Sequence, residues 1–88
     1  TPRFVTYSLR VIEARPVGKE SQHLKLRLAR PNNSPIDGIG FRLFNNGATL
    51  IRPSDYVDVA YALEINQWNG DTSLQLRLED VRPHQPQE

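Results

Sequence analysis

An Asn-Gly turn between two alternating apolar runs constrains the fold of this chain more than any other feature. The first run places an apolar residue at every second position: Val57, Val59, Tyr61, Leu63 and Ile65. The second run does the same with Leu74, Leu76 and Leu78. A period of two is typical of a strand with one buried and one solvent-facing side. Because Asn69 and Gly70 both tolerate positive φ, the segment from Tyr56 to Arg82 is predicted to form a long β-hairpin.

The tip of the predicted hairpin carries Trp68, the only tryptophan of the chain. An exposed Trp at this place would offer a platform on which a flat ligand stacks. The same side chain could instead fold back and cap the hydrophobic core, because Trp is usually largely buried. The sequence leaves both interpretations open.

The length and composition of the chain favour a single small domain with a closed sheet. Its 88 residues include no Cys and only two His, so neither disulfides nor a Cys/His zinc site can hold the fold together. A domain of this size buries only about 60–65% of the surface that its unfolded chain exposes. A closed β-sheet is the most economical way to build a sufficient apolar core.

Three further features bear on the origin and location of the chain. It begins with Thr1-Pro2 and has no Met, so we expect it to be a piece of a longer protein. The absence of Cys fits a reducing cytoplasm, where we expect the protein to act. No apolar run approaches the ~18 residues of a membrane span, so we expect no membrane contact.

Five strands are predicted, at short and even spacing. Three precede the hairpin: Phe4 to Ala14, His23 to Ala29, and Ile36 to Phe44. The third has Ile39, Phe41 and Leu43 on its apolar face, and Gly38 and Gly40 interrupt it as at a bulge or a barrel bend. The predicted interior consists of Leu24, Leu26, Leu28, Phe41, Val57, Val59, Leu63, Leu74, Leu76 and Leu78, with Tyr61 assigned to the core.

The predicted fold is an all-β, five-stranded Greek-key barrel of the OB type, with little or no helix. An SH3-like barrel is the main rival, although its strands would be shorter than this hairpin. We expect residues 1–82 to form the barrel and residues 83–88 to form a flexible polar tail.

Charge is distributed unevenly along the chain. Residues 1–52 carry a net charge of +6, and residues 53–88 carry −5. Outward-facing Lys25, Arg27 and Arg42 on the second and third strands would form a stripe able to follow phosphates. The alternative is that these cations only fill the solvent face of amphipathic strands. In an OB barrel, however, this face and the loops after the first and fourth strands are the usual binding surface.

Several segments together resemble the OB domain of the bacterial RecJ family of single-stranded-DNA-specific exonucleases. The most specific is Leu-Glu-Ile-Asn-Gln-Trp-Asn-Gly at 63–70, followed by Leu-Gln-Leu-Arg-Leu-Glu-Asp at 74–80. His-Leu-Lys-Leu-Arg-Leu at 23–28 and Asp-Gly-Ile-Gly-Phe at 37–41 are weaker matches. The resemblance covers residues 20–82. It implies an OB domain that grips single-stranded DNA, within a 5′–3′ exonuclease of DNA repair and recombination.

The resemblance also implies that catalysis occurs elsewhere in the parent chain, on an Asp-His-His motif and carboxylates that bind Mn²⁺ or Mg²⁺. His23 and His84 have no carboxylate or second His at ligand spacing, whereas a two-metal nuclease site needs several such ligands. We therefore expect no catalytic residue, no metal site and no cofactor in this fragment, and we expect the fragment to be monomeric.

The residues predicted to bind nucleic acid fall into three kinds. The expected phosphate contacts are Lys19, Lys25, Arg27, Arg42 and Arg77. Trp68 and Phe44 are the stacking candidates, and Asn66 could donate to phosphates or base edges. The facing of Arg10 and Arg15 is undetermined, because the first strand lacks strict alternation. Two alternatives remain: a structural or protein-docking module without DNA contact, and a sugar-binding barrel, which would require more exposed aromatic residues.

Overall fold

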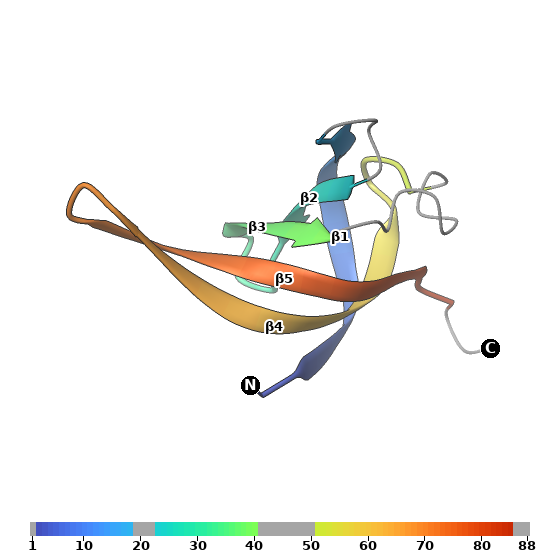
Figure 1. The fold of residues 1–88 in the computed structure, drawn as a ribbon. Coiled ribbons are helices and arrows are strands. Elements are labelled where there is room, and N and C mark those ends of the chain that lie inside the picture. The colour runs from blue at the N-terminus through green and yellow to red at the C-terminus, as the bar shows by residue number, and fades with distance from the viewer. Residues whose placement is uncertain (1, 19–22, 41–50, 86–88) are drawn as a thin grey trace.

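A computed structural model of the chain describes residues 2–18, 23–40 and 51–85, without the side chain of Trp68. Five strands form a closed barrel in the order β1-β2-β3-β5-β4 (Figure 1). Their bounds are β1 Phe4–Val17, β2 His23–Ala29, β3 Pro35–Gly40, β4 Tyr56–Trp68 and β5 Asp71–Pro83. This closed arrangement of five strands confirms the predicted all-β OB barrel. In the described ranges no helix is long and apolar enough to cross a membrane.

Strand β2 forms the centre of the core, as its alternation predicts. Leu24, Leu26 and Leu28 are at most 1% exposed, and they point inward between hydrogen-bonded neighbours β1 and β3. The core is completed by apolar residues from all five strands and from Ile51. Of the predicted interior, Val57, Val59, Leu76 and Leu78 are also confirmed, and Tyr61 packs partly buried against the core.

Strand β1 closes the barrel because two bulges bend it. Its first half pairs with β4 and its second half with β2, with register shifts between Thr6 and Leu9 and between Val11 and Glu13. Ser8 sits in the first shift with a positive φ of 62°, which is uncommon for a residue other than Gly. The strand continues to Val17, three residues beyond the predicted end at Ala14.

The β4–β5 hairpin extends well beyond the barrel (Figure 1). Asn69 and Gly70 have φ values of 51° and 82°, which confirms the predicted turn. The prediction that Leu63 and Leu74 lie inside is wrong, because these side chains are 43% and 44% exposed. They lie on the face that continues the barrel interior. However, β1 pairs with β4 only as far as Tyr61, and β3 pairs with β5 only between Gln75 and Arg77. Beyond these pairings the hairpin is a two-stranded ribbon, and this face is uncovered.

The facing of β3 also differs from the prediction. The buried residues are Ile36, Gly38 and Gly40, whereas Ile39 is half-buried on the outer face beside Lys25. The physical reason is close packing on Gly38: a Cβ built there would lie 3.1 Å from Cγ and Cδ1 of Leu78. The two glycines thus occupy the interior positions, where the prediction expected apolar side chains. Phe41, Leu43 and the predicted end of this strand lie outside the described residues.

The chain remains attached to the barrel at the end of β5. The His84 N–H donates to the Tyr56 carbonyl at 2.8 Å, and His84 Nδ1 lies 2.8 Å from Asp58 Oδ1. Asp58 Oδ1 also accepts from the Ser8 N–H at 2.9 Å, so one carboxylate links β1, β4 and the residue after β5. Barrel hydrogen bonds therefore continue past residue 82. The flexible tail stays a prediction, since residues 86–88 lie outside the described residues.

These contacts predict an acid-dependent contribution of Asp58 to stability. Desolvation would raise the pKa of its carboxyl, but the hydrogen bonds from Ser8 and His84 and the charge of His84 outweigh it and lower the pKa from its ordinary value. A lowered folded-state pKa stabilises the fold above the unfolded value and loses that effect as pH falls through the folded value. We therefore expect Asp58→Asn to be less stable than the wild type near neutral pH, and the difference to disappear in acid as the pH falls through the lowered pKa of Asp58.

Urea denaturation over a pH series would measure this difference. Asp71→Asn removes the same charge from an exposed residue beside the hairpin turn and serves as the control. A stability difference between Asp58→Asn and the wild type that does not change with pH would contradict this role of the Asp58 charge.

Candidate functional site

Two neighbouring rows of side chains cross the outer face of the barrel, perpendicular to its strands. The first row, which we call the basic row, consists of residues that are directly paired on neighbouring strands. They are Arg15, Lys25, Ile39 and Arg77, from β1, β2, β3 and β5. A second set, the acidic row, consists of Glu13, Arg27, Asp37, Gln75 and Glu64, from β1, β2, β3, β5 and β4. Residues two apart on a strand are separated by about 7 Å, so the rows run side by side.

Local sequence places each cation on this face. The buried leucines of β2 turn Lys25 and Arg27 outward, and Leu76 and Leu78 do the same for Arg77. The outward facing predicted for Lys25 and Arg27 is confirmed. Arg15 reaches the same face through the bulge between Val11 and Glu13, which shifts the alternation of β1 by one residue.

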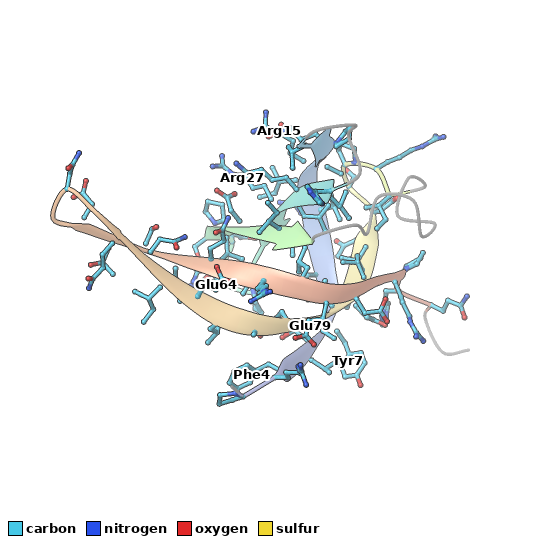
Figure 2. The ribbon with its side chains drawn as sticks, in the orientation of Figure 1. Phe4, Tyr7, Arg15, Arg27, Glu64 and Glu79 are labelled. Atoms are coloured by element: carbon cyan, nitrogen blue, oxygen red, sulfur yellow. The ribbon has the colours of Figure 1, made fainter. Side chains whose placement is uncertain are left out.

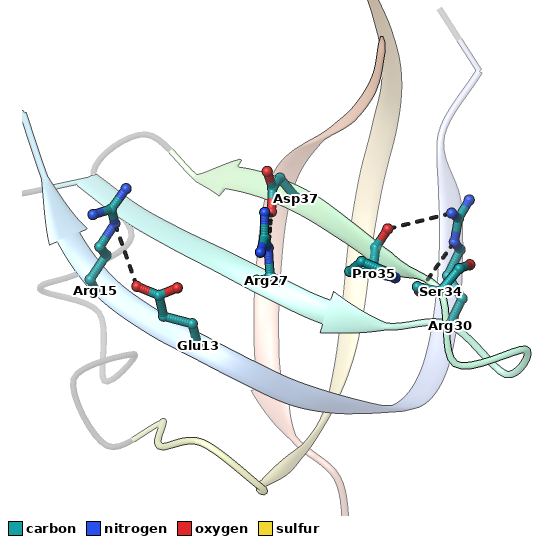
Figure 3. Close-up of polar contacts among 7 residues, drawn as sticks. All are labelled: Glu13, Arg15, Arg27, Arg30, Ser34, Pro35 and Asp37. Atoms are coloured by element: carbon teal, nitrogen blue, oxygen red, sulfur yellow. Dashed lines mark hydrogen bonds and ion pairs between the residues drawn. The ribbon is translucent and has the colours of Figure 1, made fainter.

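Carboxylates accompany every arginine of the two rows. The shortest ion pair within the two rows joins Arg27 Nε to Asp37 Oδ1 at 3.0 Å (Figure 3). Arg15 Nε lies 3.9 Å from Glu13 Oε1, and Arg77 Nε lies 3.8 Å from Glu64 Oε1. The hydrogen bond to Asp37 and its negative charge raise the pKa of the Arg27 guanidinium. All these side chains are at least one-third exposed, so the pairs contribute little to stability.

Lys25 differs from these arginines. Among the residues that the structure describes, it has no ion-pair partner, and it borders a hollow of about 140 Å³. The walls of this hollow come from both rows and from β2: Glu13, Arg15, Lys25, Leu26, Arg27 and Asp37. The ammonium group of Lys25 is therefore available to an external anion, with the Arg15 guanidinium on the adjacent strand.

The chemistry of this face suits a chain of anions rather than a single small ligand or a metal ion. Three cations and one apolar side chain lie in a line across four strands, in contact with solvent. Spaced positive charges with an apolar surface between them match a phosphodiester backbone with its sugars and bases. No group of three His, Asp or Glu side chains able to hold a metal ion occurs in the described part of the chain.

The structure brings together three of the predicted binding residues, Lys25, Arg27 and Arg77. Asn66 lies apart from the basic row, on β4 beyond the acidic row, and its Nδ2 donates to Gln75 Oε1 at 3.0 Å. Lys19, Arg42 and Phe44 lie outside the described residues, and Trp68 is described only by its backbone at the end of β4. Their predicted roles stay predictions.

Two members of the basic row were not predicted. Arg15 could not be assigned a face from sequence, because bulges in β1 interrupt its alternation. Ile39 was assigned to the apolar face of its strand, and only the buried glycines on either side indicate otherwise. The exposed Phe4 and Tyr7 lie on the opposite side of the barrel from Arg15 and Arg27 (Figure 2). These two aromatic residues are therefore not part of this face.

Three kinds of comparison with known proteins each give a match. The family model of the RecJ OB domain matches residues 1–80. Over 78 residues the chain is 33% identical to the single-stranded-DNA-specific exonuclease RecJ of Salmonella typhimurium. This match covers 84% of the chain but only 12% of the relative's length. Among solved structures, a mitochondrial single-stranded DNA-binding protein of S. cerevisiae, Rim1, has a similar fold, with a TM-score of 0.61 and 17% identity over 96% of this chain and 97% of that one.

Proposed function

This chain belongs to the RecJ OB domain family, and we propose that it binds single-stranded DNA as one domain of a longer single-stranded-DNA-specific exonuclease. The observation that carries the proposal is the basic row, where three cations from three strands line up across the outer face. The proposed ligand, single-stranded DNA, and the proposed exonuclease activity of the parent protein are taken from the name of the Salmonella relative.

In the proposed complex the DNA backbone follows the basic row across the strands. Lys25 and Arg77 bind phosphates on either side of Ile39, and Arg15 extends the line over β1. Ile39 offers an apolar surface to a sugar or base. Trp68 and Phe44 remain the proposed stacking residues, and Lys19 and Arg42 the proposed further phosphate contacts. Each stacked base would contribute ~1–3 kcal/mol to binding.

We place strand cleavage in the remainder of the parent chain, with Mn²⁺ or Mg²⁺ as its cofactor. The reasons are the motifs expected of the family and the absence, within the described ranges, of a cluster that could hold a metal ion. The domain would hold the substrate beside that catalytic centre. We further propose that the parent acts in the cytoplasm in DNA repair and recombination, and that the domain alone is a monomer.

Replacement of Lys25 tests the proposed site. We expect Lys25→Ala to weaken binding of a short oligothymidine about fivefold at low salt, corresponding to ~1 kcal/mol for an exposed charge contact. The loss should be similar for all base sequences, because phosphates carry no sequence information. The slope of log K against log salt should decrease by roughly 0.7. An NMR titration at several salt concentrations would measure both effects and detect weak binding.

Arg82→Ala is the matched control for this variant. Arg82 carries the same charge on β5, but it pairs with Asp80 at 2.8 Å and lies five residues beyond Arg77, away from the basic row. We expect this variant to bind like the wild type. Equal weakening by both substitutions would indicate only a response to net charge, and binding unaffected by Lys25→Ala would refute the site.

One observation favours a second function, docking onto another part of the parent protein. Leu63, Ile65 and Leu74 form an exposed aliphatic face on the projecting hairpin, with exposed fractions of 43%, 68% and 44%. An apolar interface would depend little on salt, whereas phosphate contacts weaken steeply as salt increases. The same titration therefore separates the two functions.

A further inference from the structure

The acidic row borders the proposed DNA path along its whole length. Asp37 lies two residues before Ile39 on β3, and therefore about 7 Å from the basic row. Glu13 and Glu64 continue this border on β1 and on β4. These separations are shorter than the Debye length of about 8 Å at physiological salt, so the carboxylates act on any phosphate bound at Lys25 or Arg77.

Each of these carboxylates also neutralises an arginine of the face. Asp37 holds Arg27 at 3.0 Å, a normal distance for a charge-assisted hydrogen bond. The pairs at Arg15 and Arg77 are longer, at 3.9 and 3.8 Å. A phosphate can therefore bind Arg27 only by displacing Asp37. Lys25 has no ion-pair partner among the described residues, so a phosphate that binds it displaces none of them.

From this arrangement we infer that Asp37, with Glu13 and Glu64, restrains DNA binding: it keeps Arg27 from the phosphates and confines the backbone to the basic row. This inference rests on the proposed function and adds a determinant of affinity to it. The restraint has two physical sources, repulsion between carboxylate and phosphate and internal pairing of the guanidinium. The face thus carries more positive groups than it uses for binding.

Asp37→Asn tests the inference, because it removes the charge and keeps the size of the side chain. We expect oligothymidine binding at low salt to become roughly three- to tenfold tighter. The slope of log K against log salt should become steeper by roughly 0.7, since Arg27 becomes one further phosphate contact. In an NMR titration, the Arg27 Nε signal should shift on DNA addition in the variant and stay unchanged in the wild type.

The control for this test is Asp80→Asn, which changes the net charge by the same amount. Asp80 also pairs with an arginine, Arg82, at 2.8 Å, but it borders a hollow with Tyr7 on the other side of the barrel, so we expect unchanged DNA binding. Equal tightening by Asp37→Asn and Asp80→Asn would overturn the inference, because net charge alone would explain it. Unchanged or weaker binding by Asp37→Asn would overturn it as well.

Glu64→Gln provides a second variant, should Asp37→Asn fail to fold. Its carboxylate pairs with Arg77, so DNA binding should also become tighter, by a smaller factor.

Lys25→Ala, titrated alongside, separates the two proposals. If Lys25→Ala weakens binding and neither acidic substitution tightens it, the site stands and the restraint is wrong. If neither the wild type nor the acidic-row variants bind, both proposals are wrong.

Discussion

Replacing Leu26 with Ala is expected to lower the free energy of unfolding by roughly 2–5 kcal/mol. The Leu26 side chain is 0% exposed, and its strand is hydrogen-bonded to a neighbour on each side. A closed barrel cannot readily collapse around the missing isobutyl group, so a cavity should remain. In a domain of this size each kcal/mol lowers the melting temperature by roughly 4–8 °C, so it should fall by roughly 8–40 °C. Urea and thermal denaturation followed by circular dichroism would measure both quantities.

Leu63→Ala is the matched control, because the same atoms are removed from a side chain that is 43% exposed. We expect it to lower the free energy of unfolding by about 1 kcal/mol or less. The difference between the two variants depends on the hairpin extending past the barrel. Comparable losses would mean that Leu63 lies in the core, and the exposed placement of the hairpin would be wrong.

The alternation of β2 and the Asn-Gly turn made most of the fold predictable from sequence. In β2 every interior position is a leucine, and the bounds His23–Ala29 agree residue for residue. Asn69 and Gly70 fixed the position of the hairpin turn, because few other residues accept positive φ in succession. Both signals are local, so they require no knowledge of neighbouring strands.

The errors arose where burial depends on a distant strand. Leu63 and Leu74 lie on the correct face, but alternation indicates only the face and not whether another strand covers it. The interior positions of β3 were missed because Gly38 and Gly40 carry no apolar side chain to indicate them. The facing of Arg15 is not predictable from sequence, because the bulges in β1 change it without a clear sequence signal.

The candidate site was predictable in its cations but not in its electrostatics. Lys25, Arg27 and Arg77 could be assigned to the solvent face from the leucines beside them. Their alignment across strands, and the pairing of Arg27 with Asp37, depend on the register between β2, β3 and β5. Register is set by the whole barrel, and the ten-residue separation of Arg27 and Asp37 in sequence gives no sign of the 3.0 Å contact.

Replacing Gly38 with Val is expected to lower the free energy of unfolding by roughly 1–3 kcal/mol through overpacking. Gly38 faces the interior between Leu26 on β2 and Leu76 on β5. A Cβ alone would already lie 3.1 to 3.2 Å from three side-chain carbons of Leu78, and the two methyl groups of Val would enter the same space. Val is favourable in strands, so the loss should come from this contact and not from the backbone. Urea denaturation would measure it.

A double-mutant cycle with Leu78→Ala identifies the contact responsible. Leu78→Ala alone should be destabilising because it opens a cavity beside Gly38, since Leu78 is only 3% exposed. In the double variant the Val side chain can occupy that cavity. The combined loss should therefore be smaller than the sum of the single losses by roughly 1 kcal/mol or more.

Leu28→Ala, another buried Leu→Ala change, provides the control cycle, and its effect should add to that of Gly38→Val within about 0.5 kcal/mol. Additive losses in the Leu78 cycle would contradict the packing of Leu78 on Gly38, and with it the reason why glycine occupies an interior position of β3.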